Sequence, residues 1–182
     1  VCSSDLGMII AVVKMKIVVV SDSHGRDDAL EYVLQQHGDA YAYIHCGDID
    51  ADPGAFPRFV TVGGNNDIFY DYPDEQILSI GTHRIFIVHS HQFMYSRRSQ
   101  QLADAAKERS CDIVCYGHTH IAADETVDGI RLINPGSLWR SRDGRGPSYA
   151  LLNIDGDTVD VQFEFLPQKQ KRSEEHTSEL QS

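Results

Sequence analysis

The chain of 182 residues lacks an excess of positive charge. Its 16 Lys and Arg residues stand against 27 Asp and Glu residues, so the formal net charge is −11 at pH 7. A surface that binds nucleic acid through phosphate contacts needs positive charge, and this composition argues against one. The composition still allows an enzyme that cleaves phosphate esters, because bound metal cations reverse the local sign of charge.

Cysteine is scarce as well. Of the four cysteines, Cys2 falls in a terminal segment, and the spacing of Cys46, Cys111 and Cys115 is unlike that of a zinc or disulfide framework. We therefore expect the last three to be buried free thiols of a protein that resides in the reducing cytoplasm.

No apolar run is long and charge-free enough to predict a membrane span. The longest candidate, Met8 to Val20, contains Lys14 and Lys16 and has no small-residue cleavage site, so we do not interpret it as a signal peptide either. No membrane partner is expected. The end of this run predicts the first buried strand of the fold.

Both ends of the chain lack a periodic pattern and resemble translated sequencing-adapter sequence. We predict a partly non-native N-terminal extension at residues 1–14, one domain at 15–166 and a non-native tail at 167–182. The native start is then Met15 or Met8. No internal repeat or linker divides the remaining chain, and its length suits one domain with a real core.

Short β-branched runs separated by turn signals predict an α/β fold. The expected helices cover residues 27–36 and 97–109, and Asp27 is the expected N-cap of the first. We expect His83 at the surface, and Arg97 and Arg98 on a solvated helix face. The strands are expected at 16–20, 40–45, 59–62, 76–80, 83–88, 112–116, 125–127, 131–133, 148–154 and 158–165.

Five polar clusters each follow directly after one of these apolar runs. They are Asp22-Ser23-His24, Gly47-Asp48, Gly64-Asn65-Asn66-Asp67, His89-Ser90-His91 and Gly117-His118-Thr119-His120. In extended backbone the side chains at i and i+2 point to the same side, so a spaced pair aims two groups at one point. Ligand sites of open α/β sheets lie beyond the carboxyl ends of strands, where we expect these clusters to meet.

The chemistry of these clusters favours a pair of metal ions. Carboxylate, amide and imidazole ligands without thiolate suit Mn²⁺, Ni²⁺, Fe, Zn²⁺ or Mg²⁺. There are too many ligands for one structural zinc ion. A site with two metal ions, about 3.5–4 Å apart as such pairs usually are, fits the count better.

The motifs also resemble a known family in type and in order. The segments that carry the resemblance are Ser21-Asp22-Ser23-His24, His45-Cys46-Gly47-Asp48, Gly64-Asn65-Asn66-Asp67, Tyr116-Gly117-His118-Thr119-His120 and Ile133-Asn134-Pro135-Gly136-Ser137. Together they resemble the calcineurin-like metallophosphoesterases, and within them the small prokaryotic phosphodiesterases. The resemblance runs from about Met15 to Phe165 and implies a four-layer α/β/β/α sandwich, the metallo-dependent phosphatase-like fold.

The resemblance further implies two divalent ions, with Mn²⁺ preferred, and a set of residues that hold them. The implied ligands are Asp22, His24 and His120 for one ion, Asn65, His89 and His118 for the other, and Asp48 as a bridge between both. The implied activity is hydrolysis of the phosphodiester bonds of a small phosphoester substrate, by attack of a metal-bridging hydroxide.

One position departs from the pattern of many family members. They carry a histidine, thought to protonate the leaving group, where this chain has Asn66. Asn66 can hydrogen-bond a phosphate oxygen but cannot donate a proton as an acid. His91, Asp67 and bulk water remain as candidates for that role.

Two alternatives stay open beside the diesterase. The first is a phosphomonoesterase or pyrophosphatase on the same site, because the loop with Arg140, Arg142 and Arg145 could bind a dianionic phosphate. The second is a non-catalytic interaction protein similar to the retromer subunit that shares this fold. The sequence is compatible with a homo-oligomer but does not fix the oligomeric state.

Overall fold

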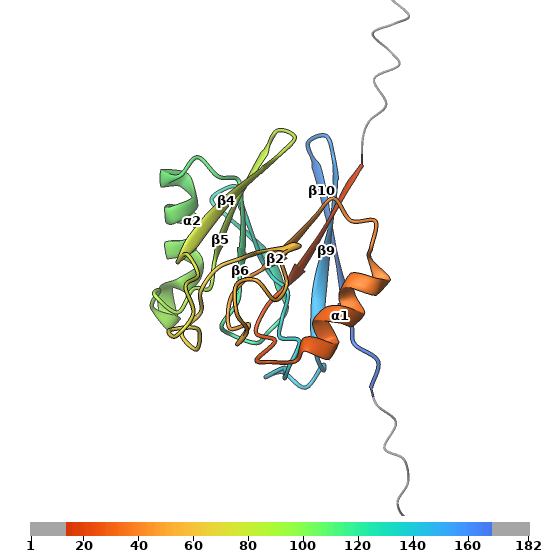
Figure 1. Ribbon diagram of the computed structural model, residues 1–182. Helices are drawn as coiled ribbons and strands as arrows, with labels where there is room; N and C mark the ends of the chain where they lie inside the picture. Colours follow the sequence, from red (N-terminus) through yellow and green to blue (C-terminus); the bar gives the residue numbers. More distant parts are fainter. Residues whose placement is uncertain (1–13, 169–182) are drawn as a thin grey trace, which may run out of the picture.

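The structure is a computed structural model that describes residues 14–168. The ends of the chain predicted above, residues 1–14 and 167–182, lie outside that range except for residues 14, 167 and 168. Within it, two five-stranded sheets pack face to face, and one helix covers the outer face of each (Figure 1). The four-layer α/β/β/α sandwich predicted above is confirmed.

The first sheet has the strand order β10-β9-β1-β2-β3, in which β1, β2 and β3 are parallel and β9 and β10 antiparallel. Its strands are β1 (Met15–Val20), β2 (Ala42–His45), β3 (Phe59–Thr61), β9 (Ser148–Asp155) and β10 (Thr158–Phe165). The parallel strands lie in the middle and at one edge, so their carboxyl ends open on the same side of the molecule.

The second sheet has the order β4-β5-β6-β8-β7, with a parallel centre of β5, β6 and β8 between antiparallel edges. Its strands are β4 (Glu75–Ile80), β5 (His83–Val88), β6 (Ile113–Tyr116), β7 (Ala123–Val127) and β8 (Ile130–Asn134). All ten strands fall where the sequence predicts them, with ends shifted by no more than a few residues.

Alternation along the central strands explains the layers. Ile17 and Val19 of β1 face the other sheet, whereas Val18 and Val20 face the helix α1 (Asp27–Gln36). A strand that is buried on both faces therefore needs apolar residues at successive positions, which is why these segments have no polar alternation. Strand β5 repeats the pattern, with Phe86 packed toward the helix α2 (Arg98–Glu108).

The helix ends differ from the expectations. Helix α1 spans the predicted residues, but its N-cap is Arg26 and no side chain caps it, so the prediction of Asp27 as the N-cap was wrong. Asp27 instead lies in the first turn, where its negative charge interacts favourably with the helix dipole. The second predicted helix begins as a 3₁₀ turn (Tyr95–Arg97) and continues as α2 (Arg98–Glu108).

His83 was expected at the surface, and this was wrong. Only 7% of the residue is exposed. Its Nδ1 lies 2.6 Å from a carboxylate oxygen of Asp112, and its Nε2 lies 2.8 Å from the carbonyl oxygen of Gly156. Burial alone would lower the pKa of His83, but these contacts outweigh it and raise the pKa. Both partners are remote in sequence, so the hairpin signal at β4–β5 could not reveal them.

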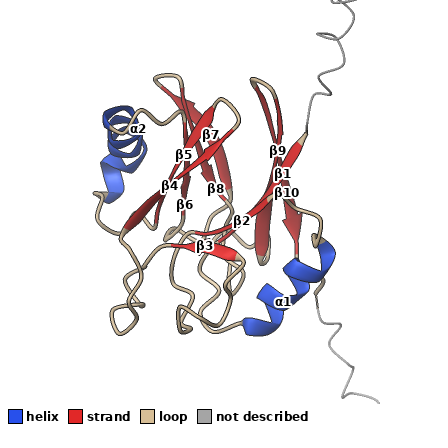
Figure 2. Cartoon of the chain, turned by 45° about the horizontal axis from the view of Figure 1, so that its top comes forward, coloured by secondary structure: helices blue, strands red, loops and turns tan. Residues whose placement is uncertain are grey.

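The strand ends divide the molecule into two poles. The short hairpin turns lie at one pole, and the long loops that follow β1, β2, β3, β5 and β6 gather at the other (Figure 2). No helix of residues 14–168 combines the length and apolar character needed to cross a membrane. Cys46, Cys111 and Cys115 are free and buried, as expected.

Candidate metal centre

The five predicted clusters meet at the carboxyl ends of the parallel strands. Backbone hydrogen bonds extend the pairing of β1 and β2 beyond the sheet, because the N–H groups of Asp22 and His24 donate to the carbonyl oxygens of Gly47 and Asp48 at 2.9 Å. Within the second sheet, the N–H of Gly117 donates to the carbonyl oxygen of His89 at 3.2 Å, and across the sandwich the N–H of His118 donates to Oδ2 of Asp22 at 3.0 Å. Both sheets therefore contribute loops to one site.

Two groups of ligand atoms form in this site. Asp22, His24 and His120 bring one oxygen and two nitrogens within 4.8 Å of one another, and Asp48, His89 and His118 do the same. The oxygen of Asn65 joins the second group, 3.1 Å from Nε2 of His89 and 3.1 Å from Nδ1 of His118. All seven residues predicted as metal ligands are thus brought together.

The two groups touch each other through their aspartates. Nε2 of His89, in the second group, lies 3.8 Å from Oδ1 of Asp22 in the first. Nε2 of His24 lies 3.8 Å from Oδ2 of Asp48, and the same oxygen is 3.2 Å from Nε2 of His89. Asp48 therefore stands between the two groups, where a bridging ligand would have to stand.

The backbone of these loops is strained. Five of the seven residues have a positive φ, and a sixth, His89, directly precedes one that does. Residues other than glycine rarely occupy this region. The residues with positive φ at this pole are Asp22 (51°), His24 (44°), Asp48 (56°), Asp50 (52°), Ser90 (86°), His118 (74°) and His120 (60°). Such strain persists only where the surrounding structure imposes it, and it clusters at functional sites.

Two glycines allow the loops to approach so closely. A Cβ on Gly64 would overlap the carboxylate of Asp48, and a Cβ on Gly117 would overlap the hydroxyl of Ser21 and lie 2.7 Å from Oδ2 of Asp22. Neither position has room for any other residue. The glycines that precede Asn65 and His118 are therefore required by packing against the two aspartates.

Asp22 supplies the most direct indication of a cation. Its Oδ1 is buried and makes no hydrogen bond, although Nε2 of His120 lies only 3.1 Å away. Burial by itself would raise the pKa of Asp22, but His120, His89 and the Ser21 hydroxyl outweigh it and hold the pKa at about 2. A buried, ionised oxygen without a donor is costly unless a cation binds it.

The imidazoles are oriented to offer lone pairs to the centre. Nδ1 of His89 donates to the carbonyl oxygen of Cys46 at 2.7 Å, and Nδ1 of His120 donates to that of Arg140 at 3.0 Å. Each ring then carries its lone pair on Nε2, which faces the aspartates. A backbone or carboxylate partner on the outer nitrogen is the usual arrangement of metal-binding histidines.

His118 is held neutral. Burial, followed by the proximity of His89 and Arg98, lowers the pKa of His118 to about 4. The neutral ring therefore has a free lone pair at neutral pH, as a ligand requires. The donor set of carboxylate, amide and neutral imidazole fits a divalent cation, and the orphaned oxygen of Asp22 gives that cation a place.

The three residues named for other catalytic roles differ in their surroundings. Asn66 is exposed, its amide nitrogen lies 3.2 Å from Nδ1 of His24, and its N–H donates to Asp48 at 2.8 Å. His91 is exposed at the rim, with its ring centre 5.5 Å from that of His89. Both lie where a substrate could reach them.

Asp67 is buried below the site and joins its loops. Its Oδ2 accepts the N–H groups of Asp48 and Gly64 at 2.7 and 2.9 Å, and its Oδ1 accepts that of Asp50 at 3.0 Å. Both oxygens already face N–H donors, so the carboxyl group has no room to present a proton to a substrate. Of His91, Asp67 and bulk water, Asp67 is therefore the least suited to protonate the leaving group.

Sequence reasoning missed two supporting residues. Asp50 lies with Oδ2 3.3 Å from Nδ1 of His24, so it orients that ring. The hydroxyl of Ser137 donates to the carbonyl oxygen of Asp22 at 2.8 Å and fixes the loop after β8 against the loop after β1. The Asp48-x-Asp50 spacing could have indicated the first, whereas the contact of Ser137 spans the whole fold.

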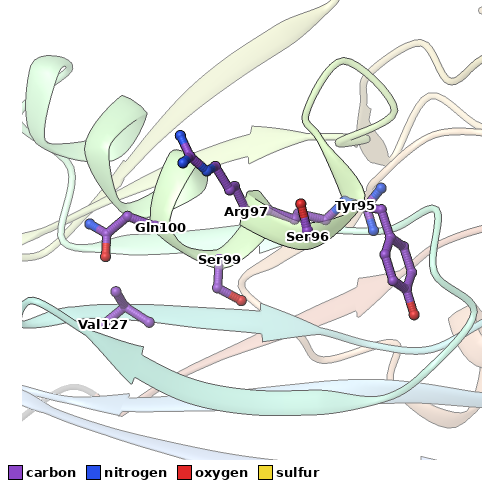
Figure 3. Close-up of a pocket in the computed structure, with 7 residues that line it drawn as sticks. Tyr95, Ser96, Arg97, Ser99, Gln100 and Val127 are labelled. Atoms are coloured by element: carbon purple, nitrogen blue, oxygen red, sulfur yellow. The ribbon is translucent and has the colours of Figure 1, made fainter.

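A hollow of about 450 Å³ opens at the start of α2 (Figure 3). None of the residues that line it belongs to either ligand group. It is lined by Tyr95, Ser96, Arg97, Arg98, Ser99, Gln100 and Val127. Arg97 is exposed as expected, but Arg98 is half-buried, its Nε is buried without a partner, and burial lowers its pKa. The expectation of a solvated face holds only for Arg97.

The sequence model of the calcineurin-like phosphoesterase superfamily domain matches residues 15–157. This chain belongs to that superfamily. A probable metallophosphoesterase of Bacillus subtilis, YsnB, is 34% identical over 152 residues, which cover 82% of this chain and 90% of YsnB. Members of the superfamily are hydrolases, and the chain is accordingly a metal-dependent phosphoester hydrolase.

Two further similar proteins are described as phosphoesterases of related kinds. The phosphodiesterase MJ0936 of Methanocaldococcus jannaschii is 29% identical over 144 residues, covering 67% of this chain and 83% of the relative. A crystal structure of a conserved protein from Streptococcus pneumoniae, described as a predicted phosphoesterase, superposes with a TM-score of 0.79 at 31% identity. The matched region covers 85% of this chain and 91% of the Streptococcus pneumoniae chain.

Proposed function

We propose that this phosphoesterase hydrolyses phosphodiesters with two divalent metal ions, one in each ligand group. The observation that carries the proposal is the pair of adjacent groups, each with an aspartate and two imidazoles within 4.8 Å. A single group would support one ion. The position of Asp48, in reach of His24 as well as His89, supports its role as the shared ligand.

The residues present fit such ions. Asp22, His24 and His120 would hold one ion, Asn65, His89 and His118 the other, and Asp48 both. When bound, a pair of divalent ions lowers the pKa of a coordinated water toward neutrality and neutralises charge on the phosphate oxygens. Oxygen and imidazole ligands suit Mn²⁺, which we propose as the preferred ion, ahead of Ni²⁺, Fe, Zn²⁺ and Mg²⁺.

The protein residues around the ions position the substrate. The exposed amide of Asn66 can donate a hydrogen bond to a phosphate oxygen but no proton. His91 at the rim, or water, is left to protonate the leaving oxygen. Without a well-placed acid, esters with good leaving groups should react fastest. The relative from Methanocaldococcus jannaschii, a phosphodiesterase, supports diesters as the substrate class.

Turnover of bis(p-nitrophenyl) phosphate tests this proposal. We expect release of p-nitrophenolate that requires added Mn²⁺ and stops when a chelator removes it. An alkyl diester such as dimethyl phosphate should react far more slowly, because its leaving group needs protonation. Absence of metal-dependent release across Mn²⁺, Ni²⁺ and Zn²⁺ would reject the diesterase.

Monoester or pyrophosphate hydrolysis is the second candidate. Arg140 and Arg142 follow the site, and the N–H of Arg142 donates to the carbonyl oxygen of His120 at 3.2 Å. Among residues 14–168, neither guanidinium pairs with a carboxylate, so both are available to a dianion. Faster turnover of p-nitrophenyl phosphate than of the diester would favour this candidate.

A non-catalytic interaction protein is the less supported alternative. A member that had lost activity would be expected to lack some metal-binding side chains. In this chain all seven ligand positions carry a residue that can bind a metal ion, and the groups are assembled. Metal content distinguishes the two, because an enzyme with this site should retain its ions.

A further inference from the structure

We propose that Trp139 forms one wall of a subsite that binds an aromatic ester group of the substrate. This inference rests on the proposed diesterase and narrows its substrate class to phosphodiesters with an aryl or nucleobase-like group. Trp139 is the only tryptophan of the chain. It lies five residues after the end of β8. The proposed metal centre does not require an aromatic side chain at this position.

The loop is fixed to the metal centre through Ser137. The Ser137 hydroxyl donates to the carbonyl oxygen of Asp22 at 2.8 Å and accepts the N–H groups of Trp139 and Arg140, each at 3.0 Å. The N–H of Leu138 donates to the carbonyl oxygen of Ser21 at 3.1 Å. The position of the indole is therefore set by the same backbone that carries Asp22.

The indole ring touches two proposed ligands of the first ion. Its centre lies 4.9 Å from that of His24 and 6.1 Å from that of His120, both in edge-on arrangements. A group that is esterified to a phosphate beside these histidines would thus lie within reach of the indole. No other tryptophan, tyrosine or phenylalanine among the described residues makes a ring contact with a ligand histidine.

A groove of about 390 Å³ lies beside the indole, and none of the proposed metal ligands lines it. Trp139 lines it together with Arg26, Pro147 and Leu166, and with the two residues that follow Leu166. Its volume lies within the range of sites for small molecules, and its walls combine apolar surface with one guanidinium. Such walls suit a flat aromatic group better than a sugar alone or a short alkyl chain.

The indole remains available for stacking. Trp139 is 43% exposed, which is a large apolar surface to leave in water. The guanidinium of Arg140 lies over one face of the ring, 5.0 Å from its centre. Aromatic groups stack on indole and on guanidinium planes alike, and such stacking tolerates different bases.

A structural role alone does not account for Trp139. A core residue would be buried, and Trp139 is not. Its packing against His24 could merely hold that ring, but His24 is already held by Asp50 through Nδ1. Arg140 and His24 lie against the indole and still leave Trp139 43% exposed beside the groove. A substrate group that stacks there would account for this exposed aromatic surface.

Binding of two diesters separates the subsite from the reaction. Diphenyl phosphate and dimethyl phosphate carry the same charge and differ in their aromatic groups. With the Mn²⁺-loaded chain, calorimetry should give diphenyl phosphate about tenfold tighter binding. Because Trp139 is the only tryptophan, its fluorescence should be quenched saturably by diphenyl phosphate and not by dimethyl phosphate.

Variants of Trp139 complete the test. Trp139→Ala should reduce the tenfold preference to about twofold or less, and Trp139→Phe should keep part of it. Tyr41→Ala removes an exposed aromatic residue just before the amino end of β2, whereas the metal centre lies beyond its carboxyl end. This control should leave the preference for diphenyl phosphate intact. Equal weakening of both ligands by Trp139→Ala would overturn the inference, since it would place the effect on the histidines. So would an unchanged preference.

These outcomes are independent of the proposed activity. If bis(p-nitrophenyl) phosphate is not hydrolysed but the binding preference depends on Trp139, the diesterase fails and the subsite stands. If hydrolysis proceeds and the preference does not depend on Trp139, the subsite fails alone.

Discussion

Strand β5 carries a histidine at its first residue and another just beyond its last, and the two have opposite surroundings. His83 at the amino end is fully satisfied, with one nitrogen on Asp112 and the other on the carbonyl oxygen of Gly156. His89 at the carboxyl end has one nitrogen on the Cys46 carbonyl oxygen. Its other nitrogen faces Asp48 at 3.2 Å, with further ligand atoms around it.

The difference extends to the two poles of the sandwich. At the hairpin pole a buried polar group finds partners within the protein and contributes to stability. At the loop pole, carboxylates and imidazoles converge on the same points, the backbone is strained and Oδ1 of Asp22 makes no hydrogen bond. Burial of polar groups is common to both poles. The loop pole is identified as the functional pole because its carboxylates and imidazoles converge without all of their polar atoms being hydrogen-bonded within the protein.

Loss of Asp48 should have the largest effect. Asp48→Asn removes the charge shared by both groups, and we expect turnover of the aryl diester to fall at least about a hundredfold, beyond the usual effect of losing an outer partner of a ligand. Steady-state kinetics at saturating Mn²⁺ measure this. Asp52→Asn, an exposed acid of the same loop, is the matched control. Activity of Asp48→Asn close to that of the control would show that Asp48 is not a shared ligand.

A gain should follow from restoring an acid at position 66. Asn66→His places an imidazole beside the substrate, and acids so placed contribute about 10²–10⁴-fold in favourable cases. We expect about a tenfold rise for an alkyl leaving group and little change for p-nitrophenolate. The ratio of the two rates is the measurement. If the ratio does not move, the poor reactivity of alkyl esters has another cause than the missing acid.

The hairpin pole should respond in stability and not in activity. His83→Gln loses a hydrogen-bonded charge, and we expect about 1 kcal/mol less stability in denaturant unfolding with unchanged turnover. The double variant His83→Gln, Asp112→Asn should lose little more, because the two residues act as one pair. A large loss of activity in His83→Gln would erase the distinction between the two poles.

The same pair should be sensitive to pH. The pKa of His83 is raised in the folded chain above its ordinary value of 6.5. Its stabilising contribution is therefore complete below pH 6.5, where the unfolded chain is protonated too, and is lost as pH rises through the folded pKa. The stability difference between wild type and His83→Gln should thus shrink on going from acidic to alkaline pH. A difference that grows with pH would contradict the assignment.

The sequence predicts the loop pole better than the hairpin pole. Strands such as β1 and β5 are evident because burial on both faces demands continuous apolar runs, and the polar clusters that meet at the loop pole follow directly after those runs. His83 was misjudged because Asp112 and Gly156 lie 29 and 73 residues away. The helix start at Arg26, the role of Ser137 and the place of Trp139 likewise depend on contacts between distant loops, which local patterns do not encode.

The number of metal ions bound per chain tests the central claim most directly. Calorimetric titration of the metal-free protein with Mn²⁺, checked by elemental analysis after desalting, gives this number. Two adjacent ligand groups that share Asp48 predict about two ions per chain. A value of one, or none, would contradict the account.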